Sequence, residues 1–317
     1  MEESHHLAIQ AYTSPGAQLN LSAESLNDTG RTFNISAKVT HAFHPFTMSP
    51  VVRVSLLDPA SVGASEAVLK LYDYRCMVNF REEMDNNQSW SETKELAYRQ
   101  QHLKDPRRES FDEEDMSDGE FEAYLEERSQ LFYKQEKQTY ERLKEGQGTW
   151  LPKLYCSVSI SRPDGTTVKG LLLEYIPSIS LRDFVSTWTS RVPPLPIDLL
   201  KRVGDTAVAL IDRVSDFDVL NRDVRIDNVL IRESALNVEE VEPEPYPVVL
   251  IDLADCRLRQ PDESDEDWRK AKRDQDESGA MGCVLLMKVE QQIGKDIWTY
   301  KRSTRYDRPG WDENEDI

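Results

Sequence analysis

The segment Asn221 to Asn228, which reads Asn-Arg-Asp-Val-Arg-Ile-Asp-Asn, places the carboxylate of Asp223 five residues before the amide of Asn228. Another carboxylate, Asp252, stands where the apolar run 248–251 ends. Phosphoryl transfer needs one carboxylate to orient the attacking hydroxyl and accept its proton, and further oxygen ligands to hold Mg²⁺ beside the phosphates. Asp223 suits the first role, and Asn228 and Asp252 suit the second. These side chains predict a site that transfers phosphate.

Each of these side chains also has a common structural use. Asp223 and Asn228 are residue types that stabilise turns through their own backbone, and Asp252 could end a strand in the same way. Their joint occurrence, in an order that supplies every oxygen group of the reaction, favours the functional interpretation.

The two segments resemble motifs of the protein kinase superfamily, whose catalytic loop reads HRDxxxxN and whose metal-binding motif reads DFG. The second motif here reads Asp-Leu-Ala, beginning at Asp252. The resemblance implies that Asp223 is the catalytic base and that Asn228 and Asp252 bind magnesium. It also gives Arg225 the place of the cation that neutralises the transferring phosphate.

Upstream, the segment Ala67-Val68-Leu69-Lys70 is similar to the VAIK strand of kinases. The resemblance implies that Lys70 contacts the α and β phosphates of ATP and forms an ion pair with Glu136 on the helix that follows. Downstream, the segment Gly282-Cys283-Val284-Leu285 resembles the start of the helix at the base of the large kinase lobe, and this resemblance implies that Glu277 replaces the usual aspartate there.

The segment Leu171 to Ile176 resembles the kinase hinge, the connection that binds adenine. By that resemblance the backbone groups of Glu174 and Ile176 bind the adenine ring, and Leu173 is the gatekeeper residue beside it. The expected cofactors are therefore ATP and Mg²⁺.

Some positions depart from the kinase pattern. The chain has His44 to Pro50 where kinases have a glycine-rich phosphate loop, and the catalytic loop begins with Asn221 instead of histidine. Three functions stay open. The first is an active phosphotransferase, with Ser/Thr protein kinase favoured, and the second is a pseudokinase that serves as a binding module. The third is a small-molecule kinase of the aminoglycoside or choline kinase type, whose signature needs only Asp-x-x-x-x-Asn followed by an aspartate.

The elements around these residues predict an α+β, bilobal, protein-kinase-like fold. We expect a small amino-terminal lobe with a five-stranded antiparallel sheet and one main helix, which starts at the capping pattern of Ser117 and Glu120. The predicted strands follow from alternating or continuous apolar runs and lie at 33–39, 51–57, 67–72, 154–160 and 168–175.

The predicted domain organisation has a disordered or loosely packed tail over residues 1–30. The kinase-like amino-terminal lobe covers 31–176 and contains a charged insertion at about 81–130. The shortened, mainly helical carboxy-terminal lobe covers 177–317, with helices expected at Leu181–Trp188, capped by Ser180, and at Ile197–Val214.

The charge of the 317-residue chain limits its partners. Its formal net charge is −19, which repels phosphate backbones, so we expect no nucleic acid partner. No apolar run approaches the roughly twenty residues that cross a bilayer. The polar amino terminus does not resemble a secretory signal, so we expect an intracellular, cytoplasmic protein, with the nucleus left open. The expected substrate is a protein or a small molecule that carries a hydroxyl.

Overall fold

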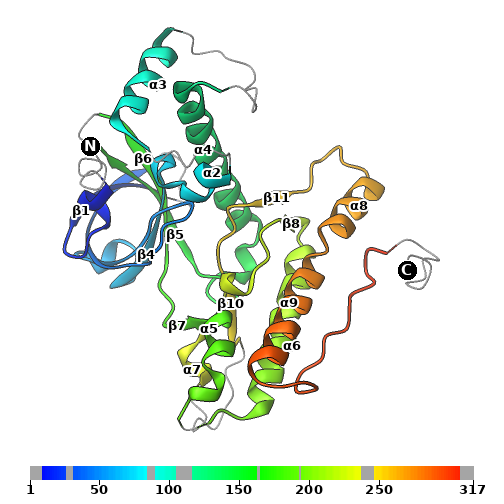
Figure 1. Cartoon of the computed structure of the whole chain (residues 1–317). Helices are drawn as coiled ribbons and strands as arrows, with labels where there is room; N and C mark the ends of the chain where they lie inside the picture. Colours follow the sequence, from blue (N-terminus) through cyan, green and yellow to red (C-terminus); the bar gives the residue numbers. More distant parts are fainter. Residues whose placement is uncertain are drawn as a thin grey trace. The chain divides into compact units, whose positions relative to one another are not determined.

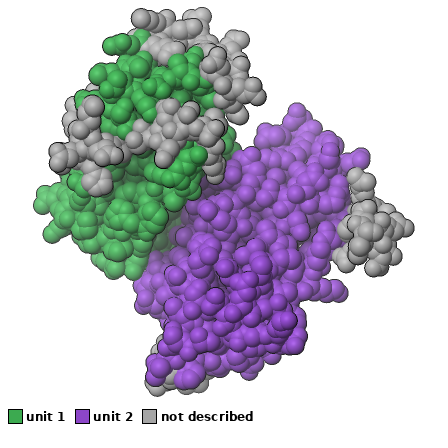
Figure 2. Space-filling model, in the orientation of Figure 1, with its two compact units in different colours: residues 1–137, 153–175 green, residues 138–152, 176–317 purple. Residues whose placement is uncertain are grey.

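The structure is a computed structural model of the chain, and it describes residues 9–25, 31–83, 90–104, 116–162, 165–192, 194–236 and 246–307. The described chain divides into two compact units (Figure 2). Unit 1 comprises residues 1–137 and 153–175, and unit 2 comprises residues 138–152 and 176–317. Within the described residues, no helix combines the length and the apolar character that crossing a bilayer requires.

Unit 1 is built on a closed antiparallel barrel of six strands in the order β1-β2-β3-β4-β6-β5 (Figure 1). Side chains of alternating positions fill the barrel interior, among them Leu21, Ile35 and Leu69, so the barrel is a packed core. The strands are β1 (Gln18–Glu24), β2 (Thr32–Ala42), β3 (Val51–Leu56), β4 (Glu66–Tyr72), β5 (Leu154–Ser161) and β6 (Thr167–Glu174).

The predicted kinase-like fold is wrong, because this barrel is not the five-stranded open sheet of a kinase small lobe. The difference is strand β1, which lies within the range expected to be a loosely packed tail. Leu19, Leu21 and Ala23 of β1 point into the core, and the strand pairs with β2 on one side and β5 on the other. Strand β2 follows β1 directly in the sequence, whereas β5 begins more than a hundred residues later, and pairing with both removes the open edges of the sheet. Residues 1–8 and 26–30 of the expected tail lie outside the described residues.

The region expected to be a looped insertion is largely helical where it is described. It contains α2 (Val78–Glu83), α3 (Glu92–Lys104) and the first part of α4 (Asp118–Arg142), so unit 1 has more than the one predicted helix. The capping pattern is confirmed, since Ser117 Oγ and Ser117 N both donate to Glu120 Oε2, at 2.7 and 2.8 Å. Residues 84–89 and 105–115 of the insertion lie outside the described residues.

Unit 2 combines helices with two small sheets. One sheet has the order β10-β9-β7, and the other pairs β11 with β8. The elements are β7 (Ser178–Ser180), α5 (Leu181–Ser186), α6 (Ile197–Ser215), β8 (Val219–Asn221), β9 (Val229–Arg232), α7 (Glu233–Leu236), β10 (Val248–Leu250), β11 (Cys256–Leu258), α8 (Asp265–Gln275) and α9 (Glu277–Gln292).

Helices α6 and α9 lie side by side and supply much of the core of unit 2 (Figure 1). The apolar face that predicted α6 is buried, and the helix ends one residue later than expected. The predicted cap of α5 is also present, since Ser180 Oγ accepts a hydrogen bond from Asp183 N. The loops between the small sheets and these helices carry the residues considered next.

Candidate functional site

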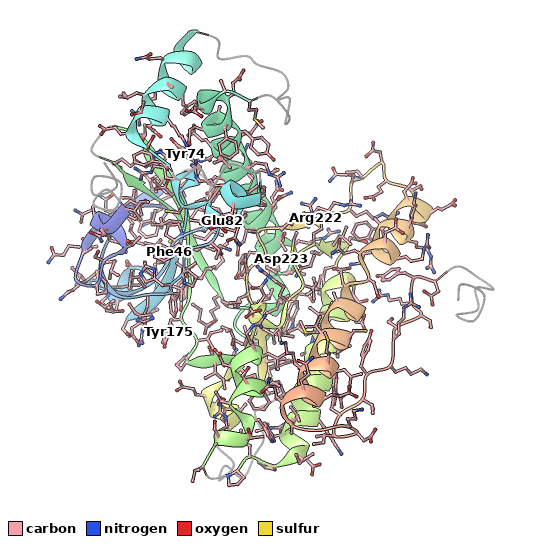
Figure 3. All side chains as sticks on the ribbon, in the orientation of Figure 1. Phe46, Tyr74, Glu82, Tyr175, Arg222 and Asp223 are labelled. Carbon is pink, nitrogen blue, oxygen red and sulfur yellow. The ribbon has the colours of Figure 1, made fainter. Side chains whose placement is uncertain are left out.

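Two loops of unit 2 lie next to each other because backbone hydrogen bonds join them. The first loop runs from Asn221 to Asn228, between β8 and β9, and the second follows β10. Ile251 N donates to Asn228 O at 2.9 Å, and Arg222 N donates to Asp255 O at 3.0 Å. The strands that flank these loops also pair, β10 with β9 and β11 with β8. The strand pairing therefore brings Asp252 to the loop that carries Asp223. Figure 3 labels Asp223 and its neighbour Arg222 on that loop.

The carboxylate of Asp223 is held by two side chains of its own loop. Asn228 Nδ2 donates to Asp223 Oδ2 at 3.1 Å and to the backbone oxygen of Asp223 at 3.0 Å. Arg225 Nη2 donates to the same Oδ2 at 2.6 Å. The backbone N–H of Asp223 donates to Asn221 Oδ1 at 2.9 Å, which fixes the turn before the carboxylate. Three of the predicted site residues are thus brought together.

The electrostatic surroundings of Asp223 disfavour its charged form. Burial raises the pKa of the Asp223 carboxyl above its usual value, Arg225 opposes this change, and the negative charge of Asp252 raises the pKa further. Two carboxylates close enough to repel each other form a site whose energy a divalent cation would lower.

Asp252 has a backbone conformation that few residues adopt. Its φ is 59°, in the left-handed region, which aspartate tolerates better than most side chains but which still costs energy. Such conformations cluster at functional sites, where surrounding contacts hold them in place. Asp218, Asp276 and Asp296 have the same kind of backbone, so this conformation agrees with a functional role for Asp252 but does not single it out.

The oxygen atoms of this loop pair fit a magnesium ion better than a transition metal. Asn228 uses Nδ2 in both of its bonds to Asp223, which directs its Oδ1 away from them. An amide oxygen and one or two carboxylates are a common protein contribution to Mg²⁺, which keeps water and phosphate oxygens as its other ligands. In the part of the chain that the structure describes, no group of three or more His, Cys, Asp or Glu side chains could hold a metal by itself.

In unit 1, Lys70 on β4 and Glu136 on α4 form the ion pair expected for them. Lys70 Nζ donates to Glu136 Oε2 at 2.6 Å, and Tyr72 OH donates to the same oxygen through a very short hydrogen bond. Lys70 and Glu136 are 7% and 0% exposed. A buried pair of this kind fixes the ammonium group at one position, while its contact with a nucleotide stays a prediction.

The residues assigned to adenine lie at the end of β6 and just after it. Leu173 is buried on β6, and the backbone N–H of Glu174 donates to Lys153 O at 2.8 Å within unit 1. Ile176 belongs to unit 2, where its backbone oxygen accepts a hydrogen bond from Ser178 Oγ at 2.8 Å. Their role in binding adenine stays a prediction.

A buried ion pair of Lys272 and Glu277 holds the backbone at the start of the Asn221–Asn228 loop, and only Glu277 of this pair was named from the sequence. Glu277 Oε1 accepts from Asn221 N at 2.7 Å, and Lys272 on α8 contacts Glu277 and donates to Val219 O at 2.7 Å. Burial lowers the pKa of Lys272 and raises that of Glu277, each effect being opposed by the partner's charge. Glu277 entered the sequence analysis through the kinase resemblance alone. No sequence feature predicted that Lys272 is buried, apart from its position four residues after Trp268 in a charged helix.

Comparison of the sequence with protein-family models found no match, and comparison with curated proteins found no relative.

Proposed function

We propose that the chain is an ATP- and Mg²⁺-dependent phosphotransferase that moves the γ-phosphate of ATP to a hydroxyl group. The observation that carries this proposal is the arrangement around Asp223, where Asn228 and Arg225 hold one carboxylate oxygen and the charge of Asp252 is near. The proposal takes nothing from the fold, because the barrel of unit 1 is not that of a kinase. It depends on the chemistry of the two loops of unit 2.

The two oxygens of Asp223 have different parts in the proposed reaction. Asn228 and Arg225 both donate to Oδ2, so we assign Oδ1 to the substrate hydroxyl. The hydroxyl oxygen forms a bond to the γ-phosphorus, its proton passes to Oδ1, and the bond to the β,γ-bridging oxygen breaks as ADP leaves. The raised pKa of Asp223 makes this carboxylate a better proton acceptor than an ordinary aspartate.

The remaining residues neutralise charge. Asn228 Oδ1 and the carboxylate of Asp252 are the assigned Mg²⁺ ligands, and Mg²⁺ bound there would neutralise charge on the β and γ phosphates. Arg225 lies next to Asp223 and is half exposed, so its guanidinium group is placed to contact a transferring phosphate.

The favoured acceptor is a serine or threonine of a protein, and a small hydroxyl compound is the alternative. A second candidate function is nucleotide binding without catalysis. The connection between β2 and β3 favours it, since residues 43–50 contain Pro45 and Pro50 and no glycine. Backbone amides approach phosphates most closely where glycine is present.

Thermal unfolding with ATP and Mg²⁺, compared with ATP and EDTA, tests the proposed metal site. A ligand at a hundred times its Kd stabilises the folded state by about 2.7 kcal/mol, so the wild type should unfold several degrees higher with Mg²⁺ than with EDTA. Asparagine at position 252 tolerates the left-handed backbone but carries no charge. In Asp252→Asn, the difference in unfolding temperature between Mg²⁺ and EDTA should therefore be lost. Asp262→Asn removes an exposed carboxylate and is the control. Equal shifts with Mg²⁺ and EDTA in the wild type would contradict the proposal, and binding without any ADP formation would favour the second candidate.

A further inference from the structure

The segment after α9 runs back along α6 and α9, the two main helices of unit 2. Two of its aromatic rings pack against glycines of these helices. We call residues 298–307 the strap; it follows α9 and passes α6 and α8 (Figure 1). The indole ring of Trp298 lies over Gly204 of α6, where an added Cβ would come within 2.7 Å of the ring. The ring of Tyr300 lies over Gly282 of α9, where an added Cβ would overlap it. The two glycines allow the aromatic rings to lie directly against the helix backbones.

Polar contacts fix the strap along its length. Trp298 Nε1 donates to Asp205 Oδ1 at 2.9 Å, and Arg305 forms an ion pair with Asp216 at 2.6 Å. Arg269 and Arg273 of α8 donate to backbone oxygens of the strap at 3.1 and 3.2 Å. The strap therefore connects α6, α8 and α9.

At its far end the strap covers the Lys272–Glu277 pair. Lys272 Nζ lies 5.8 Å from the ring centre of Tyr306 and 5.5 Å from that of Trp268, so the ammonium group is enclosed by two aromatic rings. Lys272 is 1% exposed and Glu277 is 4% exposed. At this low exposure, the two charges attract each other more strongly than they would in water.

From the covered pair, hydrogen bonds lead to the candidate site. Glu277 binds the N–H of Asn221, and Asn221 Oδ1 binds the N–H of Asp223. Lys272 binds the backbone oxygen of Val219 on the strand that precedes the loop. The contacts from Tyr306 to Asp223 are continuous, and each joins groups within unit 2.

We propose that the strap is a positioning element for the Asn221–Asn228 loop. By covering Lys272 and Glu277 it keeps their attraction strong, and Glu277 in turn holds Asn221 and the orientation of Asp223. Lys272 and Tyr306 are then positioning residues that touch no substrate. The consequence for turnover rests on the proposed function, whereas the consequence for loop conformation does not.

Two variants release the strap in different ways. Gly282→Ala adds a methyl group that must displace Tyr300, while alanine favours the helix more than glycine does, so α9 should stay folded. Tyr306→Ala removes the ring over Lys272 without moving α9, and Tyr306→Phe keeps the ring as the conservative counterpart. Gln291→Ala, an exposed position of α9, is the control for a gain in helix propensity.

The direct readout is hydrogen exchange of the backbone amides of Asn221 and Asp223, because their N–H groups make the two bonds in question. We expect exchange about tenfold faster in Gly282→Ala and in Tyr306→Ala, and unchanged in Tyr306→Phe and Gln291→Ala. If neither Gly282→Ala nor Tyr306→Ala speeds exchange at these two amides, the proposal is overturned.

ADP formation from ATP and Mg²⁺ separates this inference from the proposed function. In an active enzyme, Gly282→Ala should lower kcat about tenfold and leave the KM for ATP nearly unchanged, as expected for a misplaced base. An unchanged kcat together with faster exchange would overturn the role in catalysis. A wild type without turnover would remove the proposed function, and the exchange experiment would still decide whether the strap holds the loop.

Discussion

Asn228 Nδ2 donates to both the backbone oxygen and the carboxylate Oδ2 of Asp223, at 3.0 and 3.1 Å. This double contact closes the loop on itself and leaves Asn228 Oδ1 pointing elsewhere. One amide thus orients a candidate base with its nitrogen and offers its oxygen to a cation.

Replacing Asp223 with asparagine should stabilise unit 2 at neutral pH. The pKa of Asp223 is higher in the folded protein than in the unfolded chain. The folded state therefore loses stability as the pH rises from the unfolded-state pKa through the folded-state pKa. The neutral asparagine removes that loss of stability. The ion pair with Arg225 contributes little to stability because Arg225 is half exposed, so losing this pair costs little. We expect Asp223→Asn to unfold a few degrees higher at pH 7.5, a gain of about 1 kcal/mol. The gain should disappear near pH 3, and a variant less stable than the wild type at pH 7.5 would contradict the expected sign.

Breaking the Lys70–Glu136 pair should destabilise unit 1 strongly. Lys70→Met leaves the carboxylate of Glu136 buried without its cation, which costs about 3–5 kcal/mol. The double variant Lys70→Met/Glu136→Gln removes both charges and should recover much of that loss. Urea unfolding followed by circular dichroism measures both. Equal stabilities of the single and double variants would show that the pair is not coupled.

Gly170 of β6 allows β4 and β6 to approach each other closely. An added Cβ would lie 2.7 Å from the backbone oxygen of Lys70, which cannot move without distorting the barrel. Gly170→Ala should therefore cost about 1–3 kcal/mol, as overpacking does, and should disturb the position of Lys70. Thr167→Ala, at an exposed position of the same strand, is the control in the same urea unfolding experiment. A Gly170→Ala protein as stable as this control would argue against the described pairing.

Acid should weaken unit 1 through Asp73, which is 0% exposed and accepts hydrogen bonds from Arg75 and Arg162. Burial alone would raise the pKa of Asp73, but the two guanidinium groups bring it below the usual value. Such a carboxylate stabilises the fold above the unfolded-state pKa of about 3.9, and this contribution is lost as pH falls through the folded value. Asp73→Asn should cost about 3–5 kcal/mol at pH 7. The stability difference from the wild type should shrink at low pH, and a constant difference would contradict this role.

Contacts between individual side chains could be predicted better than the fold, while the function of these residues stays a prediction. Asp223 and Asn228 lie five residues apart in one loop, and the structure shows them in contact. The buried pair of Lys70 and Glu136 was implied by the resemblance to kinases, although the fold that the same resemblance implied is wrong.

Features that depend on distant partners could not be predicted in the same way. Strand β1 is short and lies between turn-forming residues, and its place in the barrel depends on pairing with Ser157–Ser159, more than a hundred residues later. Lys272 is buried because Tyr306 and Trp268 cover it, and nothing in a charged helix shows which lysine will be enclosed.

The most direct test of the central claim is ADP formation from ATP and Mg²⁺, measured with and without a mixture of serine- and threonine-containing peptides. The wild type should form ADP, and Asp223→Asn should form it about 10²- to 10⁴-fold more slowly while its Mg²⁺-dependent binding of ATP is kept, as expected when a positioned base is lost. An Asp223→Asn protein that turns over ATP as fast as the wild type would contradict the account.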